Sequence, residues 1–146
     1  MMHRTVLAVA AIAIGVTAVA AQSDPIATRK ATMKNVGAVT KTGGQMVKGE
    51  VPYDQAKAQE IFATYVDAST KMPTLFPESS KTGGDTAALP AIWTGMDDFK
   101  AKFAKFGSDA KAARASVKDL DSFKASFGTV TKNCGGCHET YRAKKS

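Results

Sequence analysis

Four stretches of the chain carry apolar residues at helical spacing, and together they predict an all-α fold. We expect helices over residues 25–46, 55–71, about 90–117 and about 119–141, and no strand pattern competes with them after residue 22. The last two are the most regular, because their apolar positions alternate in steps of three and four residues, as in a heptad seam. In the third helix these positions are Ile92, Met96, Phe99, Phe103, Phe106, Ala110, Ala113 and Val117, and in the fourth they are Leu120, Phe123, Phe127, Val130, Cys134, Cys137 and Tyr141.

The connections between these helices predict how the helices are arranged. The first and third connections are short, whereas residues 73–89 form one long segment rich in Pro, Gly, Ser and Thr. The pattern therefore predicts an antiparallel four-helix bundle, with a long crossover of the kind that is often functional or wraps a bound group. Gly43 and Gly44 are expected to weaken the last third of the first helix. The side chains expected to cap helix N-termini are Asp24, Asp54 and either Asp119 or Asp121.

The run Cys134-Gly135-Gly136-Cys137-His138 is the attachment signature of haem c. Each thiol can add across one vinyl group of the porphyrin, and the adjoining imidazole can bind the iron. Residues three and four apart on a helix share a face, so both sulfurs and the imidazole point to the same side. Because the two cysteines continue the apolar stripe of the fourth helix, we expect one covalently bound haem inside the bundle.

Two other uses of this motif are less consistent with the sequence. A closed zinc site needs four ligands, and two cysteines with one histidine are too few. A redox-active C-x-x-C pair usually lies at a helix start after a strand, whereas this run lies deep within a helical pattern. A structural disulfide and a chance match remain as the alternatives without a cofactor.

The N-terminal residues predict export from the cytoplasm. A basic start that includes Arg4 is followed by an uncharged apolar run up to Ala21, with small residues suited to cleavage. We expect residues 1–21 to be a signal peptide and residues 22–146 to form one domain. The run is short for an uncleaved membrane anchor, so no stable membrane insertion of the mature chain is expected. Because bacteria attach haem c outside the cytoplasmic membrane, the mature protein is predicted to be periplasmic.

Charge and histidine content narrow the function classes. The formal net charge is +7, and loss of the predicted leader removes one basic and no acidic residue, which leaves +6. The lysines are scattered through the helices, so a solvated helix surface explains them, although they also suit an acidic redox partner. No nucleic-acid-binding module, zinc pattern or phosphate loop is present. His138 is the single histidine after residue 21, so ligation of the iron by two histidines of one chain is excluded.

The motif at the end of four helices resembles a class II cytochrome c, of the cytochrome c′ family. The likeness also covers residues 29–33, residues 82–85 and residues 90–93, and it extends over essentially all of the mature chain. The resemblance implies that Arg29 and Lys30 meet the haem propionates or the haem edge. It also implies that Asp85 lies close to the haem. Lys30 departs from the glutamine that is common in the family at this position.

The resemblance makes Met33 the decisive residue, because it occupies the position over the distal face of the haem. In cytochromes c′ proper an apolar side chain covers a five-coordinate iron, whereas in low-spin relatives a methionine binds it. We therefore expect an electron-transfer protein whose axial ligands are His138 and Met33. The alternative is a protein that binds NO or CO, with Met33 as a steric gate. No enzymatic activity is expected, and a homodimer through the first two helices is an expectation of the resemblance alone.

Overall fold

The computed structural model describes residues 24–144 of the chain. Within this range the structure consists of helices and irregular segments, with one isolated β-bridge between Ala88 and Arg142. No helix in residues 24–144 is both long enough and apolar enough to cross a membrane. The α-helices are α1 (Pro25–Lys48), α2 (Gln55–Lys71), α3 (Ala91–Thr94), α4 (Met96–Ser116) and α5 (Leu120–Tyr141), and the two 3₁₀ turns are η1 (Met72–Thr74) and η2 (Glu78–Ser80).

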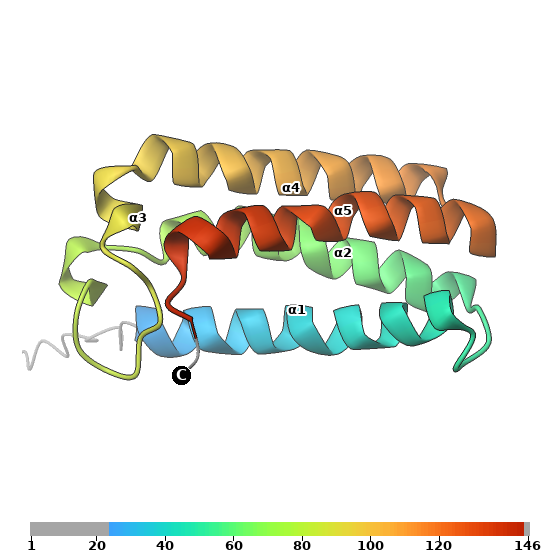
Figure 1. The fold of residues 1–146 in the computed structure, drawn as a ribbon, viewed down its shortest axis with the longest axis horizontal. Coiled ribbons are helices and arrows are strands. Elements are labelled where there is room, and N and C mark those ends of the chain that lie inside the picture. Colours follow the sequence, from blue (N-terminus) through green and yellow to red (C-terminus); the bar gives the residue numbers. More distant parts are fainter. Residues whose placement is uncertain (1–23, 145–146) are drawn as a thin grey trace, which may run out of the picture.

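The four long helices run alternately in opposite directions, which confirms the antiparallel four-helix bundle (Figure 1). α2 packs between α1 and α4, and α4 also packs against α5. α1 and α5 close the bundle, but their backbones approach each other less than those of the other three neighbouring pairs. The long segment between α2 and α4 lies over the end of the bundle where α1 begins and α5 ends. The haem motif is therefore at the covered end.

The helix starts follow the capping signals in the sequence. The carboxylate of Asp24 accepts a hydrogen bond from Ile26 N at 2.8 Å, and that of Asp54 accepts one from Lys57 N at 3.0 Å. Of the two candidates before α5, Asp119 is the cap, and its side chain forms a capping box with Ser122. These bonds satisfy amide groups that have no partner within the helix.

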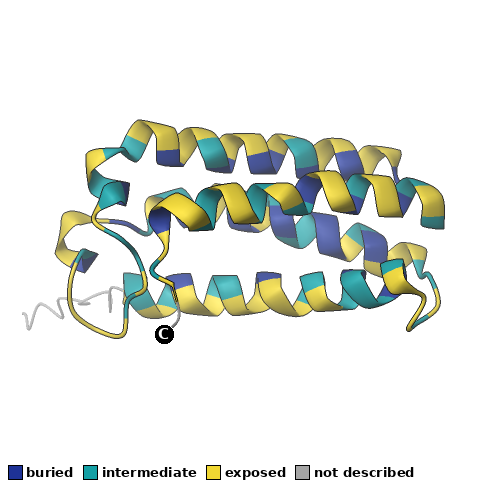
Figure 2. Ribbon diagram, in the orientation of Figure 1, coloured by how far each residue is buried: buried dark blue, intermediate teal, exposed yellow. Residues whose placement is uncertain are grey.

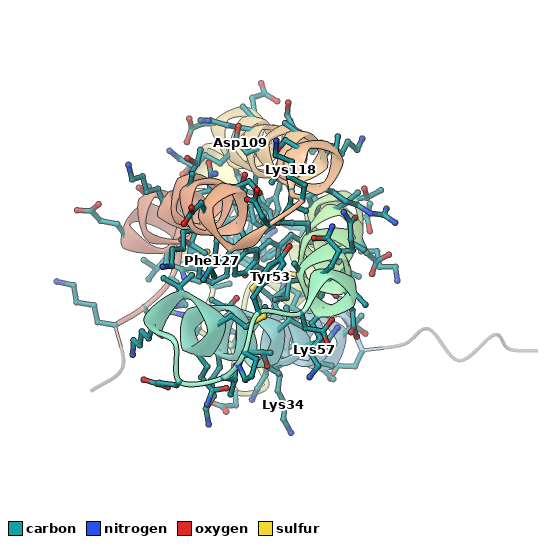
Figure 3. The ribbon with its side chains drawn as sticks, turned by 90° about the vertical axis from the view of Figure 1, so that its right-hand side faces the viewer. Lys34, Tyr53, Lys57, Asp109, Lys118 and Phe127 are labelled. Atoms are coloured by element: carbon teal, nitrogen blue, oxygen red, sulfur yellow. The ribbon has the colours of Figure 1, made fainter. Side chains whose placement is uncertain are left out.

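The apolar stripes of the helices meet in one core, as their spacing predicts. Large side chains with less than 2% exposure, among them Phe62, Tyr65 and Phe123, lie between the helices, while the outer faces are exposed (Figure 2). Along the bundle axis, Tyr53 and Phe127 point inward, whereas Lys34 and Lys57 point to solvent (Figure 3). Aromatic rings thus pack against one another at the end away from the haem motif, and a second aromatic group packs at the other end.

The third predicted helix is interrupted, which corrects one expectation. Gly95 leaves the helical region, with φ −123° and ψ 39°, and separates the short α3 from α4. A Cβ at Gly95 would lie 3.2 Å from the Ala91 carbonyl oxygen and 3.4 Å from the Tyr141 hydroxyl. Ile92 and Phe99 are both buried on either side of the break. The apolar pattern keeps its phase across Gly95 and therefore could not reveal it.

The expectation that the first helix weakens near its end is also wrong. α1 continues through Gly43 and Gly44 to Lys48. Gly43 is buried, and a Cβ on it would lie 2.4 Å from the Phe127 ring of α5. The missing side chain lets α1 and α5 come together at this end of the bundle. Tertiary packing thus outweighs the low helix propensity of glycine.

This close approach predicts opposite effects for two adjacent glycines. Gly43→Ala forces the Phe127 ring to move, and we expect it to lower the free energy of unfolding by about 1–3 kcal/mol, as overpacking does. A Cβ on Gly44 meets no atom within 4 Å, so Gly44→Ala is expected to stabilise by about 0.5–1 kcal/mol through helix propensity. Urea unfolding followed by circular dichroism measures both. Equal effects of the two substitutions would contradict this account of the packing.

Candidate functional site

A cavity lies between α1 and α5 at the end of the bundle that the long segment covers. The space it encloses, including the part that opens to solvent, is about 660 Å³. A second cavity of about 420 Å³ adjoins it. Met33, Phe103, Cys137 and His138 line both of them. The surfaces that face these spaces are mainly apolar, so an apolar group fits here better than a charged substrate does.

α5 brings the three residues of the haem motif to this cavity. Cys134 and Cys137 are free thiols, both half-buried, and Cys134 lines the second cavity. Burial raises the pKa of both thiols, and it lowers the pKa of His138, to which the charge of Arg142 also contributes. Both effects favour the neutral form of the His138 imidazole. That is the form in which histidine binds a metal ion.

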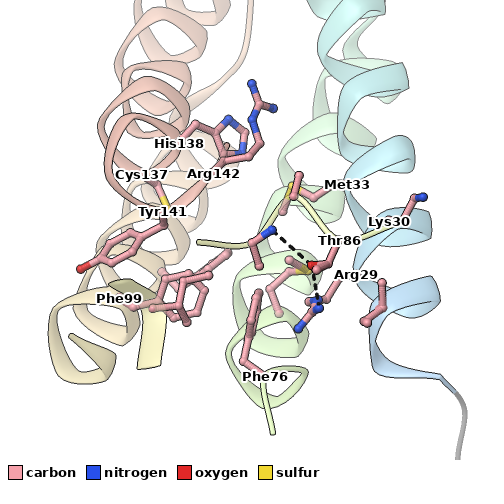
Figure 4. A pocket seen from close by; sticks show the side chains of 16 residues that line it. Arg29, Lys30, Met33, Phe76, Thr86, Phe99, Cys137, His138, Tyr141 and Arg142 are labelled. Carbon is pink, nitrogen blue, oxygen red and sulfur yellow. Dashed lines mark hydrogen bonds between the residues drawn. The ribbon is translucent and has the colours of Figure 1, made fainter. Parts of the chain in front are cut away.

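Two methionines face this motif from other elements. Met33 of α1 is half-buried and lies across the cavity from His138, as Figure 4 shows. Met72 of η1 is buried and lines the larger cavity but not the smaller one. Of these two methionines, only Met33 lines both cavities together with His138. The sequence favours Met33 over the other methionines, and no pattern in it places Met72 beside the site, because Met72 lies in the turn that follows α2.

The long segment forms a wall of the cavity and is joined to the chain beyond α5. Ala88 and Arg142 form an antiparallel bridge, with hydrogen bonds from Leu89 N to the Tyr141 oxygen and from Ala143 N to the Ala87 oxygen at 3.0 and 2.8 Å. The Tyr141 hydroxyl donates to Asp98 Oδ2 at 2.5 Å, which raises the pKa of Tyr141 to about 12. The C-terminal end of α5 is thus tied both to the loop and to α4.

Comparison with known proteins agrees with this geometry. The family model of cytochrome c′ matches residues 24–142, almost the whole described range. A cytochrome c′ from Rhodopseudomonas palustris is 46% identical over 126 residues, which are 86% of this chain and 86% of that protein. The chain belongs to the cytochrome c′ family. Like the other members of the family, it carries haem c, bound covalently here through Cys134 and Cys137.

Relatives of two kinds resemble this family member. The solved cytochrome c′ of R. palustris superposes with a TM-score of 0.82 at 50% identity and covers 86% of this chain and 100% of that one. A structural model of oxidised cytochrome c556 from the same species gives 0.78 at 31% identity over the same shares. A cytochrome c-556 from Agrobacterium fabrum is 35% identical over 118 residues, 80% of each chain. The four-helix bundle is common to both kinds.

The residues around the cavity fit a haem. Both thiols are half-buried on the side of α5 that lines the cavities, and a neutral imidazole lies beside them. Phe99 of α4 and Phe76 of the long segment supply aromatic surface to the larger cavity, and the two rings are in edge contact with centroids 4.7 Å apart. These rings give the larger cavity aromatic surface of the kind that packs against a porphyrin plane.

Arg29 is buried and holds the long segment in place, which is a role that the sequence did not predict. Its side chain is 5% exposed. Nη1 donates to the Leu75 oxygen and to Ser80 Oγ at 3.1 and 3.0 Å, and Nη2 donates to the Ser80 oxygen and to Thr86 Oγ1 at 3.1 and 3.2 Å. The guanidinium carbon also lies 4.5 Å from the Phe76 ring centroid. Burial lowers the pKa of Arg29, and nearby Asp24 opposes that shift.

These contacts restrict what Arg29 can offer to a haem propionate. A guanidinium has five N–H donors, and the bonds to the long segment use the four on Nη1 and Nη2. A two-pronged fork to a carboxylate would break these bonds, whereas a single bond from Nε would not. Arg29 does line the cavity. Its contact with a haem propionate stays a prediction.

Lys30 and Asp85 meet each other at the edge of the cavity. Lys30 Nζ lies 2.7 Å from Asp85 Oδ2, with side-chain exposures of 54% and 96%. The hydrogen bond and the charge of Lys30 lower the pKa of Asp85. Lys30 lines the cavity, but Asp85 is not among the lining residues. The pair adds a second connection between α1 and the long segment, and the expected proximity of Asp85 to the haem stays a prediction.

Proposed function

We propose that this protein is a periplasmic electron carrier in which His138 and Met33 are the two axial ligands of the haem iron. The observation that carries the proposal is the position of Met33, which faces His138 from α1 and lines both cavities with it. A thioether is a soft ligand suited to haem iron, and it raises the reduction potential. Bound haem supplies a reversible one-electron couple between Fe(III) and Fe(II).

Each part of the chain has a task in this proposal. Cys134 and Cys137 fix the porphyrin to α5, so that only small shifts are needed to keep His138 on the iron. Arg29 holds the long segment as a wall that limits access of water. The same two protein ligands in both oxidation states keep the structural change on electron transfer small. None of these groups acts on an organic substrate, which is why no enzymatic activity is proposed.

The location and partners of the protein follow from the same reasoning. The predicted signal peptide, residues 1–21, lies outside the described residues, and haem c attachment takes place outside the cytoplasmic membrane. We therefore place the protein in the periplasm, where it would exchange electrons with redox proteins. Homodimerisation through α1 and α2 stays a prediction.

Binding of a diatomic gas is the second candidate function. The relative with 46% identity is a cytochrome c′, and a variant of another cytochrome c′, from Alcaligenes xylosoxidans, has been solved as its nitric oxide complex at 28% identity to this chain. In this alternative the iron has His138 as its single protein ligand. Met33 would then fill space over the open face and admit only small ligands such as NO or CO.

Visible absorption spectra of the purified holoprotein test the two candidates. If Met33 binds the iron, the ferric and ferrous spectra are low-spin, the ferric protein shows a sulfur-to-iron band at the red end, and CO binds weakly. High-spin spectra in both states, with ready binding of CO, would contradict the proposal and favour the gas-binding alternative.

A further inference from the structure

An open hollow lies between α4 and α5 on the outer side of the haem motif. Its volume is about 720 Å³, and Gly136 and Cys137 are part of its floor. Cys137 also lines both cavities between the helices. One cysteine of the motif therefore lies between the interior of the bundle and this hollow, and a porphyrin edge bonded to Cys137 would lie close to the surface there.

Between the two cysteines, α5 carries only glycines, which have no side chains. Gly135 and Gly136 lie between the two cysteines, both are exposed, and a Cβ on either would meet no atom within 4 Å. Neither glycine has a positive φ, so neither is needed for backbone conformation. Gly136 lines the hollow, so the protein cover over a haem edge bonded to Cys137 would be thin there. Because electron-transfer rates fall steeply with distance, a thin cover favours electron exchange at this place.

Lysines surround the hollow, and no carboxylate lines it. Lys102, Lys105 and Lys132 contribute to its walls. Lys105 is 67% exposed, and its partner Asp109, at 2.8 Å, is only 22% exposed, so the ammonium group is presented outward while the carboxylate lies deeper. Lys132 is exposed and forms no ion pair with any residue between 24 and 144.

We infer that this lysine-lined hollow is the docking surface for a redox partner protein with a carboxylate-rich surface. The inference rests on the proposed electron-carrier function and assigns the place where electrons enter and leave. Opposite charges on the two proteins steer the encounter and orient it, and they do so less at high salt. One electron passes from the partner's redox group and reduces Fe(III) to Fe(II), while no bond forms or breaks and no proton moves.

Electron exchange of the holoprotein with small reagents of opposite charge tests where electrons enter. Ferrocyanide serves as the anionic reductant and the hexaammineruthenium(II) ion as the cationic one. Lys132→Glu changes the local charge by two, so about 10 Å from a highly charged anion at 0.1 M salt we expect the rate with ferrocyanide to fall about fivefold. The rate with hexaammineruthenium should rise. Lys105→Glu should change the two rates in the same directions.

Lys111→Glu is the matched control, because it makes the same change in net charge elsewhere on α4. Lys111 is exposed and lies beside Arg114 on the surface shared with α2, away from the hollow. Both rates should change much less in this variant. Opposite shifts for the two reagents also exclude a mere change in the reduction potential of the haem. If Lys132→Glu and Lys111→Glu give equal rates, the assigned surface is wrong.

The proposed function and the docking surface fail in different ways. A wild-type holoprotein that exchanges electrons with neither reagent contradicts the electron-carrier function itself. Preference for acidic proteins is tested by nuclear magnetic resonance, with poly-L-glutamate added to the ¹⁵N-labelled holoprotein. The amide signals of residues 129–137 and of Lys105 should shift at low salt and return at high salt. Shifts spread evenly over all lysine-bearing helices would overturn the docking surface and leave the electron-carrier function standing.

Discussion

Met33→Leu is expected to convert the haem iron from low-spin to high-spin in both oxidation states and to raise the affinity for CO at least about tenfold. An internal ligand that occupies the sixth position lowers the fraction of protein that can bind a gas, and its removal restores that fraction. Leucine has nearly the volume of methionine but no sulfur, so the cavity stays filled. Absorption spectra and CO titration of the ferrous protein measure the change.

The choice of leucine separates ligation from steric gating. If Met33 only covers the open face, Met33→Leu leaves the spectra and the CO affinity unchanged, and Met33→Ala alone opens the site. If Met33 binds the iron, both variants become high-spin. Met72→Leu is the matched control, because Met72 lines the larger cavity without reaching the smaller one. A change of spin state in Met72→Leu would show that Met72, and not Met33, binds the iron.

Arg29→Leu is expected to lower the free energy of unfolding of the holoprotein by about 3 kcal/mol, because four hydrogen-bonded acceptors lose a charged donor. The acceptors belong to Leu75, Ser80 and Thr86, and the guanidinium that serves them is 5% exposed. Leucine fills part of the space but satisfies none of them. Urea unfolding followed by circular dichroism and by haem absorbance measures the loss.

Two variants show whether this effect comes from the hydrogen bonds. Arg29→Lys keeps the charge but has no planar fork, so it should recover only part of the lost stability. Lys30→Ala removes a neighbouring cation that is paired at the surface with Asp85, and it should leave the stability nearly unchanged. Equal losses in Arg29→Leu and Lys30→Ala would show that the loop is held by general charge and not by the buried guanidinium.

The sequence was most informative where one residue pattern reports one local structure. The spacing of apolar residues from Phe123 to Tyr141 predicted which face of α5 points into the bundle, and both cysteines of the motif lie on that apolar stripe. The bounds of α2 follow from local signals as well, and such signals limit the cap of α5 to Asp119 or Asp121, of which the structure shows Asp119. Such features depend on residues within a few positions of each other, which a periodicity can represent.

The rest of the site depends on contacts between distant parts of the chain. The partners of Arg29 are 46 to 57 residues away, and no pattern within α1 indicates them. From the sequence alone, Gly43 predicts a weak point in the helix, because its close contact with Phe127 of α5 appears only in the folded structure. Met72 and the bridge between Ala88 and Arg142 likewise appear only when the long segment is folded over the bundle.

The central claim is that the iron lies between His138 and the sulfur of Met33. The most direct test is the proton–carbon spectrum of the ferrous holoprotein with its methionine methyl groups labelled with ¹³C. We predict that one methyl signal is shifted far upfield by the porphyrin ring current, remains in Met72→Leu and disappears in Met33→Leu. Four methyl signals in the ordinary range of folded proteins would contradict the claim, because no methionine would then lie on the iron.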